Sequence, residues 1–155
     1  MSTLSVDTIT GQTIAGNVKM PAGHVLQVVQ GTSTNYLQVG SNNAYVDTGL
    51  TATITPKYNT SKVLILHSAP TVYSDNQDAI LRLMRGSTNI HQLNVYTSSS
   101  SYNASTFAFQ FLDSPSTTSA TTYKTQAYKN QGNFFYSYTN EVASTSTLTL
   151  LEIAQ

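Results

Sequence analysis

The chain contains no cysteine, so neither a disulfide framework nor a thiolate metal site contributes to it. Charge is also scarce: only 9 % of its 155 residues are charged and the formal net charge is zero, against about 25 % charged residues in an average globular protein. Nucleic acids and anionic membranes are bound mainly through positive surface charge. We therefore expect neither of them to be a partner.

Long apolar runs are absent as well. No window approaches the roughly 18 continuous apolar residues of a membrane-spanning helix, and the first residues, MSTLSVDTITGQT, lack a basic start followed by an apolar core. We expect a soluble chain without a signal peptide or membrane insertion. A length of 155 residues suits one domain with one core.

Helical spacing is missing too, and short strand-like segments take its place. Alternating or β-branched runs recur between clusters of Gly, Pro, Asn, Asp and Ser, the spacing typical of an antiparallel sandwich or barrel. We expect up to nine strands: 24–30, 44–55, 62–68, 79–85, 89–96, 106–112, 120–128, 134–139 and 147–153.

Two segments sharpen this prediction. Arg85–Asn89 separates two alternating runs, and Gly86 can supply a positive φ there, which indicates a hairpin. Lys62–His67 is apolar on both faces, which suits a central strand buried on each side.

The stretch Leu112–Gln126, LDSPSTTSATTYKTQ, resembles a flexible linker in composition. Its flanks are patterned, however, because Phe107, Phe109 and Phe111 share one face of an extended chain and alternation resumes after the stretch. We expect an ordered corner between two paired strands, with its turn at Asp113–Pro115.

Residues 2–22 stand apart from the rest of the chain. Their apolar side chains are too thinly spaced to build a core, whereas an extended chain can add to a partner's sheet or intertwine with other copies. We predict that residues 1–22 form an attachment segment that uses Leu4, Val6 and Ile9, and that residues 23–155 form the folded domain.

Self-association follows from the scarcity of charge. Strand edges usually carry Lys or Glu, which prevent pairing with neighbouring molecules, and homo-oligomers follow closed symmetry. We predict a homotrimer in which apolar strand residues, including some of Phe134, Phe135 and Leu150, pack across subunits.

No catalytic, metal or cofactor site is predicted. His24, His67 and His91 lie in or beside separate strands without a nucleophile or metal motif; we expect His67 to be a hydrogen-bonded core or interface residue, and the other two to face solvent or a subunit contact. Asp75–Asp78 contains oxygen ligands, but an Asx-stabilised turn explains it better than a calcium site.

The ten tyrosines leave one binding site open. Tyr96, Tyr102 and Asn103 flank a serine run, and a tyrosine ring can stack on a sugar while amides and hydroxyls bond its rim. The alternative is that these tyrosines are ordinary half-buried strand or interface residues. A host-surface glycan is therefore a candidate partner.

Several segments resemble a recurring module of tail-fibre-like virion proteins of tailed bacteriophages, especially marine ones. The resemblance is carried by Ser2–Ile9, Met20–Val29, Gly49–Pro56, Ser61–Leu66, Leu81–Thr88, Leu112–Gln126 and Thr147–Ala154. It implies a β-sandwich, commonly trimeric, that follows an extended N-terminal part.

The combined expectation is an all-β protein: an antiparallel β-sandwich of jelly-roll type with an extended N-terminal segment, assembled as a trimer. It implies a non-enzymatic virion structural protein, located on the phage particle surface and joined to other virion structural proteins. A short tail fibre that binds the host surface is favoured by the resemblance. A capsid decoration protein or head fibre is the alternative, favoured by the shortness of the segment before residue 23.

Overall fold

The protein is described by a computed structural model, which defines residues 20–41, 43–74, 77–97, 103–130, 132–136 and 144–155. These residues form strands and no helix. The strands are β1 (Val25–Ser33), β2 (Leu37–Gln38), β3 (Ala44–Ile54), β4 (Lys62–Ser74), β5 (Gln77–Arg85), β6 (Thr88–Thr97), β7 (Asn103–Asp113), β8 (Thr121–Lys129), β9 (Phe134–Tyr136) and β10 (Ser146–Ile153).

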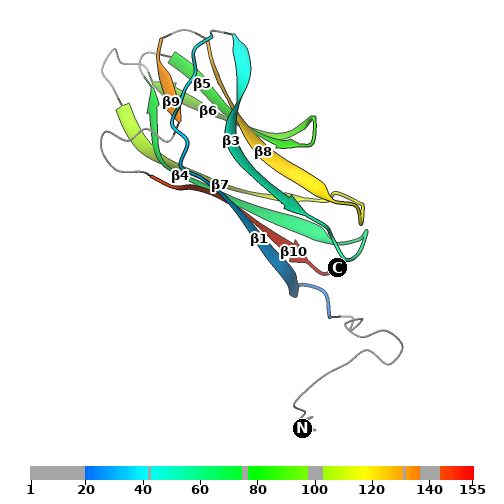
Figure 1. Cartoon of the computed structure of the whole chain (residues 1–155). Coiled ribbons are helices and arrows are strands. Elements are labelled where there is room, and N and C mark those ends of the chain that lie inside the picture. The colour runs from blue at the N-terminus through cyan, green and yellow to red at the C-terminus, as the bar shows by residue number, and fades with distance from the viewer. Residues whose placement is uncertain (1–19, 42, 75–76, 98–102, 131, 137–143) are drawn as a thin grey trace.

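The strands form two antiparallel sheets that pack as layers of a sandwich (Figure 1). Sheet A has the order β1-β10-β4-β9-β2, with β7 also paired to β4, and sheet B has the order β3-β8-β5-β6. The predicted all-β antiparallel architecture is therefore confirmed.

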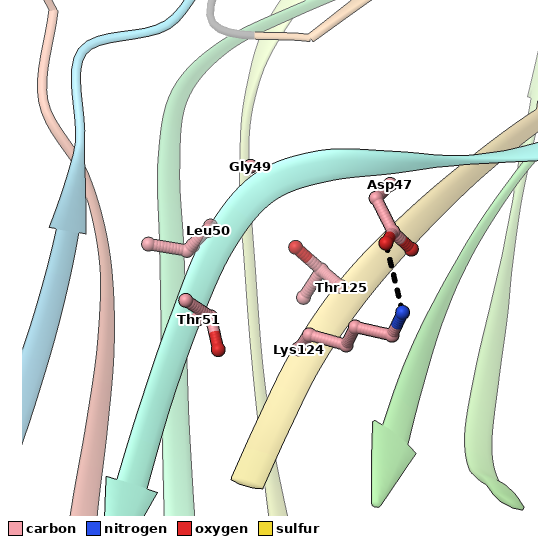
Figure 2. A pocket seen from close by; sticks show the side chains of 6 residues that line it. All are labelled: Asp47, Gly49, Leu50, Thr51, Lys124 and Thr125. Carbon is pink, nitrogen blue, oxygen red and sulfur yellow. Dashed lines mark hydrogen bonds and ion pairs between the residues drawn. The ribbon is translucent and has the colours of Figure 1, made fainter. Parts of the chain in front are cut away.

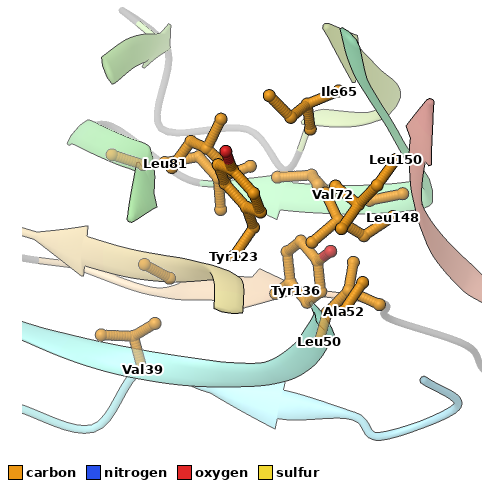
Figure 3. Close-up of a cluster of buried hydrophobic side chains, with 14 of the residues drawn as sticks. Val39, Leu50, Ala52, Ile65, Val72, Leu81, Tyr123, Tyr136, Leu148 and Leu150 are labelled. Atoms are coloured by element: carbon orange, nitrogen blue, oxygen red, sulfur yellow. The ribbon is translucent and has the colours of Figure 1, made fainter. Parts of the chain in front are cut away.

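The core lies between the sheets and takes side chains from both (Figure 3). Ile65 and Leu150 enter it from sheet A, and Leu81 and Tyr123 from sheet B; each is at most 1 % exposed. In β8 and β10 every second residue is buried, because successive side chains of a strand point to opposite faces. This alternation fixes which residues remain on the outside of each sheet.

Each of the nine predicted strands overlaps an observed one, and the two-residue strand β2 was not predicted. The predicted hairpin is also confirmed: β5 pairs with β6 up to Arg85 and Thr88, and Gly86 has φ 57°. A positive φ costs glycine little because it has no Cβ.

Strand β4 is central, as predicted, since it pairs with β10, β7 and β9. The expectation that it is buried on each side is wrong for a single chain. Val63 and Ile65 point into the core at 0 % exposure, whereas Leu66, on the other face, is 38 % exposed. One apolar face of the central strand is therefore left uncovered.

The Ser/Thr-rich stretch is an ordered corner, but β7 and β8 do not pair with each other. Strand β7 pairs with β4 in sheet A, and β8 pairs with β3 and β5 in sheet B. The corner therefore carries the chain from one sheet to the other. The expectation of two strands joined directly by a turn is wrong because both flanks have their partners elsewhere.

A buried carboxylate holds this corner in place. Asp113 accepts bonds from Arg85 Nη1, 2.9 Å from each carboxylate oxygen, and from the Tyr123 hydroxyl at 2.7 Å. Arg85 also donates to the Ser114 carbonyl. Residues of both sheets thus meet at Asp113, which explains how a stretch with little apolar content is ordered.

Candidate binding surfaces

Most of the residues predicted to bind partners fall outside what the structure describes. Leu4, Val6, Ile9 and Tyr102 lie outside the described residues. Tyr96 belongs to β6, and Asn103 is the first residue of β7, but the side chains of both lie outside the description. The attachment segment and this glycan contact therefore remain sequence-based predictions.

The residues predicted for the subunit contact need a correction. Phe134 and Leu150 are both 0 % exposed within a single chain, where they belong to the core cluster. They have no surface left to offer another subunit. Phe135 is half-buried and stacks on Tyr36, with ring centroids 5.8 Å apart. Alternating apolar residues identified these strands as core, but the sequence could not distinguish a chain's own core from an interface.

The histidines take part in aromatic packing or local bonds. His67 is buried, and its Nε2 lies 2.8 Å from the Tyr136 hydroxyl, which confirms the predicted hydrogen-bonded position. Burial lowers the pKa of His67 to about 4. His91, expected to face solvent or a subunit contact, is half-buried and stacks on Phe111 with ring centroids 4.9 Å apart, whereas His24 is exposed.

The two buried carboxylates have structural partners. Glu152 accepts bonds from Gln27 Nε2, the Lys57 amide and the Ser61 hydroxyl at 2.6–2.7 Å. Burial raises its pKa, but these bonds outweigh that effect and hold the pKa below its usual value. Glu152 and Asp113 thus each fix a loop. Within the described ranges, no three or more His, Asp or Glu residues are placed to hold a metal ion.

The outer face of sheet B is a bonded polar surface. Asp47 accepts from Lys124 Nζ at 2.8 Å and from Gln126 Nε2. Gln126 in turn accepts from Arg82 at 2.6 and 2.8 Å. The bond from Lys124 is the main cause that lowers the pKa of Asp47, which keeps the carboxylate charged. We define the polar face as Tyr45, Asp47, Arg82, Gln92, Lys124, Gln126 and Tyr128.

Two tyrosines lie within this polar face. The rings of Tyr45 and Tyr128 are 4.9 Å apart, and the Arg82 guanidinium lies 3.4 Å from the centre of the Tyr45 ring. Tyr45 also donates to Gln92. Rigid rings surrounded by amides and a carboxylate present both an apolar surface and directed hydrogen bonds. This combination suits a polyhydroxylated ligand.

A hollow of about 200 Å³ opens beside the polar face, where β3 bulges between Asp47 and Thr51 (Figure 2). Gly49 makes this bulge with φ 83°, and a Cβ at that position would come 2.9 Å from Asn35 Nδ2. The hollow is lined by Asp47, Gly49, Leu50, Thr51, Lys124 and Thr125. A glycine inside a strand pattern often marks a bulge. Gly49 could therefore have indicated this bulge from the sequence.

The outer face of sheet A has the opposite character. Strand pairing places Val28, Leu151, Leu64 and Leu112 side by side in one row across β1, β10, β4 and β7. The row ends are the most open, with Val28 58 % and Leu112 50 % exposed. We define the apolar face as this row and its apolar neighbours on the same side of the sheet: Val25, Val28, Leu64, Leu66, Leu112, Leu151 and Ile153.

Comparison with known proteins adds no relative to this description. No protein family matches the chain, and no curated protein matches its sequence. In the described part of the chain, no helix is long and apolar enough to span a membrane.

Proposed function

We propose that the chain is a non-enzymatic virion structural protein of a tailed bacteriophage, of the short tail-fibre type. Its residues 23–155 form a β-sandwich head of jelly-roll type, displayed as a trimer on the particle surface for binding to the host. Residues 1–22 attach it to other virion structural proteins through Leu4, Val6 and Ile9. The resemblance of segments spread along the chain supports this assignment, and the two-sheet architecture agrees with it.

The observation that carries a binding function is the polar face. Its charged groups are paired with neighbours, and its two tyrosine rings are held between them. A surface that is ordered before binding loses less side-chain entropy when a ligand arrives. The proposed ligand is a glycan of the host surface.

A competition experiment tests host binding. An excess of the purified protein should reduce adsorption of the phage that encodes it to its host cells. Arg82→Ala should weaken this competition, because it removes the guanidinium from Tyr45 and Gln126. The matched control is Thr118→Ala, an exposed position in the corner between the sheets. Equal competition by both variants would refute the assignment of the polar face, and a lack of competition by the unmodified protein would refute host binding.

A capsid decoration protein or head fibre is the second candidate. The apolar face favours it, since an uncovered sheet face can pack on a neighbouring capsid protein. Antibody labelling of intact particles separates the two candidates: label at the tail supports the fibre, and label distributed over the capsid supports decoration.

Deletion of residues 2–20 tests the attachment segment. The shortened protein should melt at nearly the same temperature but fail to join the particle. Incorporation at normal copy number, or loss of folding, would refute the attachment role.

A further inference from the structure

The apolar face is unusual for the surface of a single chain. Among the described residues, six large hydrophobic side chains are exposed: Met20, Val25, Val28, Tyr36, Leu66 and Leu112. Four of these six belong to the apolar face, and none lies on the outer face of sheet B. Single exposed apolar residues are normal, but a contiguous patch marks an interaction site.

The size of this face restricts what can cover it. Strands lie about 4.8 Å apart and rise about 3.3 Å per residue, so the apolar face spans roughly 20 Å across its four strands and roughly 13 Å along β4, from the level of Ile153 to Leu66. A single extended segment would cover only the width of one strand, whereas a second sheet of equal width covers the whole face.

Charge restricts the occupant further. Lys62 is the one charged residue among the described residues that β1, β10, β4 and β7 direct to this side, and it lies at the end of the patch beside Ile153. The face therefore lacks a charge pattern that would select an oppositely charged protein. Two copies of this face can meet without like charges opposing one another across the apolar rows. The face can therefore pair with itself.

We propose that the apolar face is covered in solution by the same face of another copy of this chain. In a dimer, two such sheets then pack face to face, about 10 Å apart. In a trimer, the three apolar faces meet around the threefold axis, and in both assemblies the polar faces turn outward. The copies associate through this surface in either assembly. The proposed association does not depend on a virion location, so it can fail while the proposed function holds, and the reverse.

Paired lysine substitutions test the surface. In the full chain, Val28→Lys with Leu112→Lys places two charges at the two ends of the apolar row. The matched control, Thr53→Lys with Asn94→Lys, adds the same charge at exposed strand positions of sheet B. Sedimentation should show an oligomer for the unmodified protein and for the control, and the mass of one chain for the Val28/Leu112 variant.

Cysteine cross-linking provides a second measurement that does not require the lysine variant to fold. Because the chain has no cysteine, Leu66→Cys introduces a single thiol at an exposed position of the face on the central strand β4. A short bismaleimide should join copies of this variant in dilute solution, and should not join copies of the control variant Thr53→Cys.

The measured mass and the cross-linking yield can each support or overturn the proposed self-association. A monomeric mass for the unmodified protein at micromolar concentration overturns the proposal and assigns the face to another occupant, such as a different protein or residues 1–19. An oligomer that survives the Val28/Leu112 substitutions, or equal cross-linking of the two cysteine variants, also overturns it. Selective dissociation and selective cross-linking support it.

Discussion

The two outer faces of this sandwich differ although the sheets share one core. On sheet B, charged side chains alternate with buried ones, and Asp47, Lys124, Gln126 and Arg82 bond to one another along the surface. On sheet A, apolar side chains continue on the outside, from Val28 to Leu112. The polar face is complete within one chain because its charged groups have partners there. The apolar face is not, because its side chains still contact water.

The difference shows where partners are to be sought in a protein with so few charges. When 9 % of residues are charged, there are too few charges to protect both faces and all strand edges. The described structure places the networks of charged side chains on the outer face of sheet B and beside the loops that Asp113 and Glu152 hold. The opposite sheet is left with an apolar outer face, and self-association can cover it.

The largest expected effect is a loss of folding stability, and it should distinguish two adjacent leucines of β10. Leu150 points into the core and is 0 % exposed, whereas Leu151 lies on the apolar face. Leu150→Ala should lower the free energy of unfolding by about 2–5 kcal/mol through lost burial and a residual cavity. Leu151→Ala should act mainly on association, so it should reduce the dependence of the unfolding midpoint on protein concentration.

Urea unfolding at two protein concentrations measures both effects. Leu150→Ala should shift the midpoint similarly at both concentrations. If Leu151→Ala does the same, with no change in the concentration dependence, the contrast between the inner and outer faces of sheet A is wrong.

The next largest effect is a loss of folding stability in acid. His67 packs on the inner side of sheet A, and burial lowers its pKa from the ordinary 6.5 to about 4. Between these values the unfolded chain binds a proton that the folded chain does not, so the free energy of unfolding falls as pH decreases from 6.5 to 4. The expected loss is about 3 kcal/mol. His67→Gln should remove most of this loss, as measured by urea unfolding at pH 7 and pH 4.5.

Carboxylates on both sheets respond only at a lower pH than His67. Asp47 on the polar face and Glu152 in sheet A both have lowered pKa values, so their contribution to stability is present above the ordinary carboxyl pKa and lost only at lower pH. An unchanged loss of stability between pH 7 and pH 4.5 in His67→Gln would show that a different group causes the acid sensitivity.

The strands and their inward faces could be predicted from the sequence because alternation is a local property. Phe107, Phe109 and Phe111 share the inner side of β7, as the pattern indicated. Strand partners depend on contacts distant in sequence, so the corner after Asp113 was predicted as ordered but with the wrong neighbours. Arg85 and Tyr123, which bond Asp113, come from β5 and β8, and no local pattern indicates such a meeting.

The binding surfaces were harder to predict. The apolar outer side of Lys62–His67 is visible in the sequence, but the pattern alone does not distinguish a side buried within the chain from one left exposed. The row from Val28 to Leu112 appears only when four strands are placed in register. The polar face also appears only when distant strands are placed side by side, because Asp47 and Gln126 are 79 residues apart in the sequence.

The smallest expected effect tests whether the polar face is complete within one chain. Lys124 and Asp47 form a 2.8 Å ion pair, with side chains 32 % and 53 % exposed. Water and salt screen such a pair, which typically contributes between 0 and 1 kcal/mol. Lys124→Met should therefore lower the free energy of unfolding by less than about 1 kcal/mol and leave the sedimenting mass unchanged. The Asp47→Asn variant and the double variant complete a mutant cycle whose coupling energy should shrink as salt is raised. A change of mass in Lys124→Met would mean that the polar face also contacts another copy, because a surface pair bonded within one chain has no effect on how chains associate.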